Sequence, residues 1–133
     1  MSKLLDQLLK PEIKSVRENL PEAEYRVKRL SEACGEDVIF RLRALPYGKV
    51  EEIKEMSGKD SKLHIVLEGM VEPNFRAPEL KQKFGGETPF ETMKALLLPG
   101  EIEDLARGIE KLTGYRENTI EEIKKPSANE RGK

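Results

Sequence analysis

The sequence predicts a small α+β protein, in which an antiparallel sheet of about three strands has helices packed on one face. Apolar and polar residues alternate in three segments, 24–30, 37–45 and 61–70, and this pattern is typical of half-buried strands. Between and after these segments, apolar residues recur at helical spacing and are bounded by proline and glycine. A chain of 133 residues has the length of one domain with a modest core.

Residues 2–9 predict a short N-terminal helix that the side chain of Ser2 can cap. One face of this helix is made of leucines, namely Leu4, Leu5, Leu8 and Leu9. Pro11 interrupts the helix, and residues 11–20 predict a second short one. Two interpretations of residues 1–20 remain open from sequence: a loosely docked arm, or an apolar stripe that is offered to a partner helix.

The first two alternating segments predict a hairpin. Tyr25 and Val27 face one side of the first strand, and Phe40 and Leu42 face the same side of the second. A loop that contains Gly35 is expected to join them.

A helix is then predicted from Leu45-Pro46 to Ser57-Gly58. Its expected inner face consists of Tyr47, Val50, Ile53 and Met56. The third strand is predicted over 61–70, where His64 and Val66 point outward and Leu63, Ile65 and Leu67 point inward. Pro73 ends this strand because its nitrogen cannot donate to a sheet ladder.

Three further helices are predicted between Val71 and Gly114, where the start and stop signals are clear. Pro78 suits the first position of one helix, and Gly85 suits its end. Thr88 and Glu91 predict a capping box for the next helix, with Pro89 at its first position.

The third of these helices follows Pro99-Gly100 and ends near Gly114. Its first turn is acidic, with Glu101, Glu103 and Asp104 where the helix dipole favours negative charge. Its buried stripe is predicted to consist of Ile102, Leu105, Ala106, Ile109 and Leu112.

The C-terminal part predicts a last short helix, with a capping box at 118–121 and an end at Pro126. Residues 126–133 contain no apolar side chain larger than alanine, and we expect them to be disordered. The predicted organisation is therefore one domain over 1–125, which includes a helical arm over 1–20, and a tail over 126–133.

The composition excludes several classes of function. The 24 basic and 25 acidic residues nearly cancel, so no overall field attracts the chain to nucleic acid or anionic lipid. Tryptophan is absent and aromatics are only 5%, which disfavours a base-stacking surface. A single cysteine suits a reducing cytoplasm. No apolar run approaches the roughly 18 residues of a membrane span. The sequence thus predicts a cytoplasmic protein without a membrane segment.

The polar residues do not assemble a reactive set. His64 is the one histidine and lacks further ligands at metal-binding spacing. Cys34 lacks a neighbouring activating base. Gly85-Gly86 is not followed by the Lys-Ser/Thr pair of a phosphate loop. We therefore expect no catalytic residue, no cofactor and no metal, and a protein that is not an enzyme.

A basic sheet face is the best alternative to a purely structural surface. If the two predicted strands pair, Arg26, Lys28, Arg41 and Arg43 share the outer face. Such a face could hold phosphates, and it would make the protein a small nucleic-acid-binding regulator. The missing aromatics and the near-zero net charge disfavour this alternative.

Several motifs resemble a known family in their order and spacing. They are 35–45 with its alternating pattern, Val71-Glu72-Pro73-Asn74-Phe75, a short helix ending at Phe84-Gly85, Leu96-Leu97-Leu98-Pro99-Gly100-Glu101, and a helix ending with Leu112-Thr113-Gly114-Tyr115. Over roughly residues 24–115, the chain resembles the XkdN-like tail assembly chaperones of long-tailed phages, prophages and phage-like elements of Gram-positive bacteria.

The resemblance implies a non-enzymatic chaperone that works in the cytoplasm of a bacterial host. Proteins of this family coat the long, helical tape measure protein of the tail and give way as tail tube subunits polymerise around it. The implied partners are the tape measure protein and the tail tube protein, and self-association stays open. The apolar groups that we consider for partner binding are Leu4, Leu5, Leu8, Phe75, Phe90, Leu96, Leu97 and Leu98.

Overall fold

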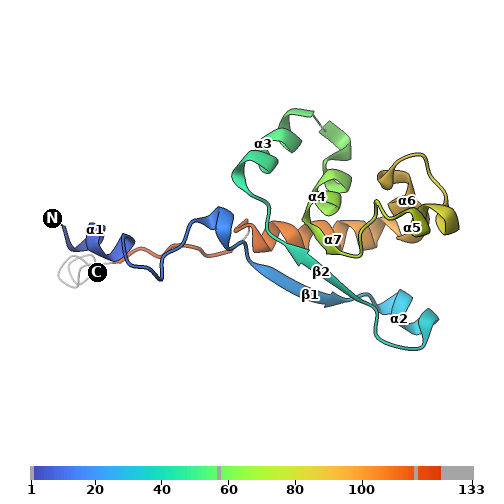
Figure 1. Cartoon of the computed structure of the whole chain (residues 1–133), viewed down its shortest axis with the longest axis horizontal. Helices are drawn as coiled ribbons and strands as arrows, with labels where there is room; N and C mark the ends of the chain where they lie inside the picture. Colours follow the sequence, from blue (N-terminus) through green and yellow to red (C-terminus); the bar gives the residue numbers. More distant parts are fainter. Residues whose placement is uncertain (1, 57, 116, 124–133) are drawn as a thin grey trace, which may run out of the picture.

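The computed structural model describes residues 2–56, 58–115 and 117–123 (Figure 1). Ser57, Pro126 and the predicted tail over 126–133 lie outside the described residues. In chain order the elements are α1 (Lys3–Leu8), the 3-10 turn η1 (Val16–Glu18), β1 (Glu22–Arg26), α2 (Lys28–Cys34), β2 (Ile39–Arg43), α3 (Tyr47–Met56), the 3-10 turn η2 (Gly58–Asp60), α4 (Ser61–Gly69), β3 (Met70–Glu72), α5 (Pro78–Phe84), α6 (Pro89–Leu96) and α7 (Pro99–Leu112).

The three strands form one antiparallel sheet in the order β1-β2-β3, and this confirms the predicted α+β fold class. Tyr25 stands opposite Phe40, and Ala23 stands opposite Leu42. Phe40 and Leu42 are buried, as predicted, because the layer of helices that contains α4 and α7 covers their face of the sheet (Figure 1). The rings of Phe40 and Phe75 pack in a T-shaped arrangement, with centroids 6.3 Å apart.

The predicted third strand is wrong over most of its length, because residues 61–69 form helix α4 and only Met70–Glu72 pairs with β2. The sequence alternation placed Val66 outward, yet this side chain is fully buried. Leu63, Val66 and Met70 are spaced three and four residues apart, so the same residues also satisfy a helical period. Packing of this segment against α7 favours the helical period over the strand period.

The predicted loop around Gly35 is also more regular than expected. β1 ends at Arg26, and residues 28–34 form α2. Gly35 ends this helix with a φ of +84°, a left-handed conformation that glycine adopts without strain. Ser31 holds the helix against β2, since the Val38 N–H donates to its hydroxyl at 2.8 Å.

Two predicted short helices do not form within the described residues. Over 11–20 only η1 is helical, and residues 117–123 contain no helix. Both segments are exposed almost throughout. A helix of so few residues is marginal in water without a surface to pack on.

Helix α3 has the predicted bounds as far as Met56, but its expected inner face is only partly correct. Ile53 is buried and Val50 is half-buried, whereas Tyr47 and Met56 are exposed. The first and last residues of the helix therefore do not pack into the core.

Helices α5, α6 and α7 confirm the three helices that were predicted between Val71 and Gly114. Thr88 Oγ1 accepts from the Glu91 N–H at 3.3 Å, as a capping box requires. The Glu91 carboxylate accepts from the N–H of Glu87, one residue before the cap, at 2.7 Å.

Helix α7 is the centre of the core. Its predicted stripe is confirmed, since Ile102, Leu105, Ala106 and Ile109 are buried and Leu112 is half-buried. Two glycines allow its neighbours to come close. A Cβ atom on Gly108 would lie 3.2 Å from Tyr25 Cζ, and one on Gly69 of α4 would lie 2.6 Å from Ile109 Cδ1.

The N-terminal end of α7 is held by an ion pair with α2. The Arg29 guanidinium donates to both carboxylate oxygens of Glu101, at 2.9 and 2.8 Å, and to the Leu96 carbonyl at 2.8 Å. Glu101 also accepts from the Leu98 N–H at 2.8 Å. The hydrogen bonds and charge of Arg29 lower the pKa of Glu101.

The contact between α4 and α7 gives a first prediction. Gly69→Ala should lower the free energy of unfolding by about 1–3 kcal/mol, because the added methyl overlaps the buried side chain of Ile109. Gly48→Ala is the matched control. A Cβ atom there meets nothing within 4 Å, so this variant should be unchanged or about 0.5–1 kcal/mol more stable. Urea unfolding measures both, and equal effects would contradict the close approach.

The ion pair gives a second prediction. A lowered carboxyl pKa contributes stability that is fully present above the ordinary value of 4.5 and is lost as pH falls through the lower folded value. Glu101→Gln should therefore lower the free energy of unfolding at neutral pH, and its difference from the wild type should shrink in acid. Denaturant unfolding at a series of pH values measures this.

Asp104→Asn is the control for the ion pair. Its carboxylate pairs with Arg107 at 2.7 Å but is largely exposed, so this variant should stay close to the wild type at every pH. A Glu101→Gln deficit that does not change with pH would show that the charge of Glu101 does not stabilise the fold.

Candidate functional site

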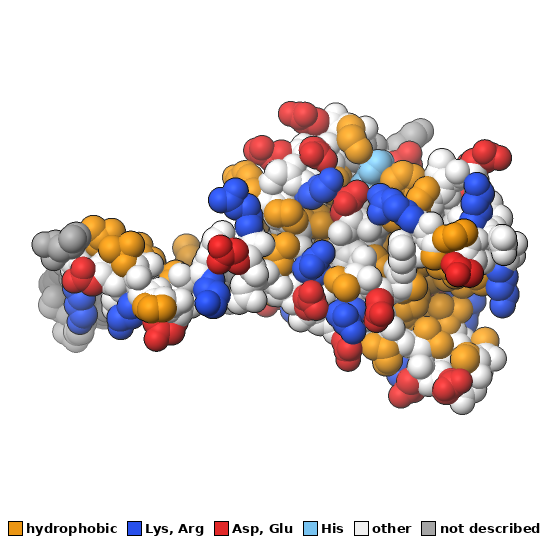
Figure 2. All heavy atoms as spheres, viewed as in Figure 1, with side chains coloured by type: hydrophobic (Ala, Val, Ile, Leu, Met, Phe, Trp, Pro, Cys, Tyr) orange, Lys and Arg blue, Asp and Glu red, His pale blue; other side chains and the backbone are white. Residues whose placement is uncertain are grey.

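The N-terminal arm has a group of exposed apolar side chains on one short helix. Helix α1 lies away from the sheet and the other helices, and hydrophobic side chains cover much of its visible surface (Figures 1 and 2). The side chains of Leu4, Leu5 and Leu8 are 63%, 42% and 55% exposed. The predicted cap is present, because Ser2 Oγ accepts from the Leu5 N–H at 3.0 Å. Every hydrogen bond that the structure gives to residues 2–19 stays within that segment.

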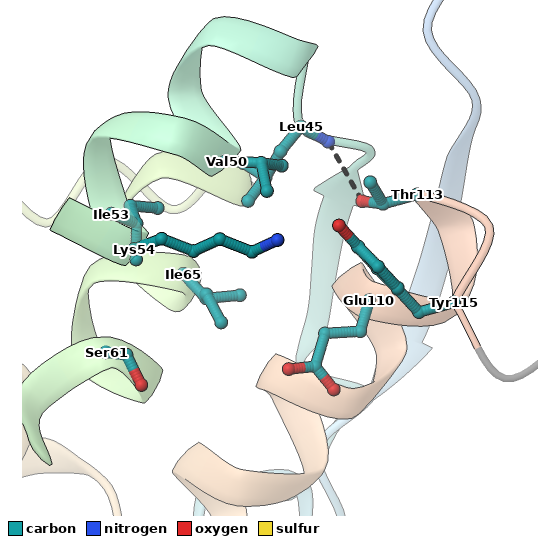
Figure 3. Close-up of a pocket in the computed structure, with 9 residues that line it drawn as sticks. All are labelled: Leu45, Val50, Ile53, Lys54, Ser61, Ile65, Glu110, Thr113 and Tyr115. Atoms are coloured by element: carbon teal, nitrogen blue, oxygen red, sulfur yellow. Dashed lines mark hydrogen bonds between the residues drawn. The ribbon is translucent and has the colours of Figure 1, made fainter. Parts of the chain in front are cut away.

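An apolar hollow of about 330 Å³ lies between α3, α4 and the C-terminal end of α7. Figure 3 shows the apolar side chains at its base, Leu45, Val50, Ile53 and Ile65. Lys54 and Tyr115 reach toward each other across its opening from α3 and from the segment after α7 (Figure 3). Ser61, Glu110 and Thr113 complete the lining.

A second hollow continues the first one toward the arm. The two share Leu45, Val50, Lys54, Thr113 and Tyr115, and the second adds Val16, Arg17, Pro46, Tyr47, Gly48, Glu51 and Gly114. We call the two hollows together the groove. Tyr47 is 82% exposed and Val16 is 66% exposed. The groove therefore begins among buried core residues and ends where the arm joins the body.

Thr113 fixes the shape of the groove. The Leu45 N–H donates to Thr113 Oγ1 at 3.0 Å (Figure 3), and this hydroxyl donates to the Ile109 carbonyl at 2.7 Å. These bonds hold the connection between β2 and α3 against the end of α7. The groove is thus lined by residues within 16–17, 45–65 and 110–115, three segments that are far apart in sequence.

The chemistry of the groove is that of a surface that binds apolar side chains. Its interior is aliphatic, and its rim has aromatic rings and both signs of charge. Exposed tyrosines beside an apolar hollow are typical of protein interfaces. The chain that the structure describes holds no group of three His, Cys, Asp or Glu residues that could bind a metal.

The apolar residues that the sequence singled out fall into two sets. Leu4, Leu5, Leu8 and Leu98 are exposed. Phe75 and Leu97 are buried in the core, while Phe90 and Leu96 are half-buried. Phe90 lies on the His64 ring, with centroids 4.5 Å apart, so His64 is not the outward strand residue that was predicted. In this conformation Phe75 and Leu97 pack inside the protein's own fold and do not face a partner.

The groove itself escaped the sequence prediction. Val50 and Ile53 were assigned only to the inner face of a helix, and Ile65 only to a strand. The available signal was two aromatic residues that line the groove, Tyr47 and Tyr115, which lie 68 positions apart in the chain. Their proximity depends on the tertiary structure, in which the connection between β2 and α3 is held against the end of α7.

The predicted basic face is a surface of mixed charge. Arg26 pairs with Asp37 at 2.8 Å, Arg41 with Glu24 at 3.8 Å and Glu72 at 3.4 Å, and Arg43 with Glu22 at 3.8 Å. Lys28 is not on a strand, because it begins α2. Alternating carboxylates therefore offset the positive field that phosphate binding would need.

A sequence model described as the phage XkdN-like tail assembly chaperone protein matches residues 5–124. The chain is also similar to the crystal structure of the protein yqbn, with 23% sequence identity and a TM-score of 0.63. That similarity covers 81% of this chain and 94% of the other, and it concerns the fold. No curated protein matches this chain. Among residues 2–56, 58–115 and 117–123, no helix is long and apolar enough to cross a membrane.

The rim and the floor of the groove should differ in their effect on stability. Tyr47→Ser should change the free energy of unfolding by no more than about 0.5 kcal/mol, because the side chain is exposed. Leu45→Ala should cost about 2–5 kcal/mol, because Leu45 is buried and its removal leaves a cavity. Urea unfolding compares the two variants. A large loss of stability in Tyr47→Ser would show that the rim belongs to the core.

Proposed function

The chain belongs to the XkdN-like tail assembly chaperones of phages, and from this premise we propose that it binds the tape measure protein until the tail tube polymerises around it. The tape measure protein and the tail tube protein are the proposed partners, and the bacterial host cytoplasm is the proposed place of action. We further propose that residues 1–125 work as one unit in which residues 1–20 are the partner-binding arm.

The exposed leucines of α1 are the observation that carries this proposal. A soluble chain seldom leaves several large apolar side chains uncovered on one helix, and such a patch typically marks an interaction site. An amphipathic helix can bind another helix through residues spaced three and four apart, as Leu4, Leu5 and Leu8 are. A long helical client offers many such sites, so that many copies of the chain could coat it.

The same chemistry accounts for release. Contacts between apolar side chains are non-directional, and each one contributes modestly. Tube subunits that cover the same apolar stripes of the client can therefore displace the chaperone without a chemical step. The proposed mechanism is one of competition between surfaces, and it requires neither a cofactor nor catalysis.

Co-expression with the tape measure protein tests the proposal. The wild-type chain should keep this client in the soluble fraction, whereas Leu4→Glu with Leu8→Glu should leave it in the pellet, because two charges interrupt the apolar face. The double variant should still unfold cooperatively, since both side chains lie outside the core.

Gln7→Glu is the matched control, because it adds a negative charge to the same helix outside the leucine face. It should rescue the client as the wild type does. A client that aggregates beside the wild-type chain would refute the proposed function. A client that stays soluble beside the leucine variant would move the binding surface away from the arm.

A further inference from the structure

Helix α1 is too short to be stable by itself. It has six residues, whereas isolated helices shorter than about 12–15 residues are marginal in water. Its four leucines, counting Leu9 just after its end, are exposed and do not belong to the core cluster. In the free protein the helix therefore needs an apolar surface to cover its leucine face.

The groove is an apolar surface of this kind, and the arm is already rooted in it. Val16 and Arg17, the first residues of η1, line its outer end. From this root the groove runs inward to the aliphatic floor around Val50, Ile53 and Ile65. The contact that η1 makes is continuous with the surface that α1 would cover.

The connection between α1 and η1 is long enough to reverse direction. Residues 9–15 form neither helix nor strand, and as seven residues they can span about 23–25 Å. Helix α1 itself is about 9 Å long, at 1.5 Å per residue. The hydrogen bonds of residues 9–15 are local, such as the one from the Ile13 N–H to the Lys10 carbonyl at 3.0 Å. A return of α1 to the groove thus requires no rearrangement of the core.

The amphipathic pattern of α1 fits such a return. At 100° per residue, its leucines cover one side of the helix, and Lys3, Asp6 and Gln7 lie on the other. With the leucines on the groove floor, these polar groups face solvent. The exposed rings of Tyr47 and Tyr115 then flank the helix and cover apolar surface at its edges.

We propose that α1 is a strap that folds back onto the groove of its own chain and places Leu4, Leu5 and Leu8 on the groove floor. The arrangement in Figure 1 is the open state of this strap. A short tether gives α1 a high effective concentration at its own groove, which favours this groove over that of another molecule. Closure covers the leucine face of α1 and the floor of the groove at the same time. A client that binds the leucines opens the strap.

The role of the strap in client binding rests on the proposed function, but the contact itself is a property of the free chain. It can therefore be tested without a client. Cys34 is exposed, so the experiment uses Cys34→Ser to leave a single attachment point. A nitroxide spin label is attached at Gln7→Cys, on the polar side of α1, and methyl NMR signals of Val50 and Ile65 report on the groove.

The label should broaden the methyl signals of Val50 and Ile65 beyond detection and leave those of Ile39, on the opposite face of the sheet, unchanged. The broadening should be the same after tenfold dilution, and it should disappear when Leu4→Glu and Leu8→Glu are added. A mixed sample tests for contact between two molecules. It contains spin-labelled chains that carry no isotope and isotope-labelled chains that carry no nitroxide, and the broadening should be absent from it.

Two results would overturn the strap. Unbroadened groove methyls in the labelled chain would show that α1 does not return to the groove. Broadening in the mixed sample would show that the occupant is α1 of a second copy. Neither result depends on the tape measure protein, so a failed client rescue together with intrachain broadening would refute the proposed function and leave the strap intact.

Discussion

The close packing of α7 is the constraint on which the rest of the fold depends. This helix supplies five buried residues, and it contacts both the sheet and α4. The sheet can approach it because Gly108 has no side chain, and α4 can approach Ile109 because its own residue there is Gly69. Interiors are packed at near-crystalline density, so a methyl group at either contact would displace a neighbour.

The two ends of α7 have different roles. At its start, Arg29 of α2 pairs with Glu101 and also donates to the Leu96 carbonyl, so it ties the helix to α2 and to the end of α6. At its far end, Thr113 supports the connection between β2 and α3, and the space between α3, α4 and α7 stays open as the groove. The core is thus closed at the start of α7. At the other end of α7, the apolar groove lies open next to residues 16 and 17 of the arm.

This arrangement suits the temporary binding that we propose. The core residues that keep the fold, such as Phe75 and Leu97, are separate from the exposed leucines of α1. The binding that we propose for the arm could therefore begin and end without unfolding of the domain. Charges on the outer sheet face are paired with each other, so this surface keeps the strand edges polar and adds little attraction for a charged partner.

The sequence by itself determined the fold class, α1 with its cap, and helices α5, α6 and α7, because their signals are local. A proline at the first position, a capping threonine and a glycine after the end act within one helical turn, whatever the rest of the chain does. Residues 61–70 show the limit of local reasoning. Their apolar residues fit a strand and a helix alike, and the contact of α4 with α7 selects the helix. Only the tertiary structure could reveal the groove, because its walls come from α3, α4 and the end of α7, and no pattern along the chain records which surfaces meet in space.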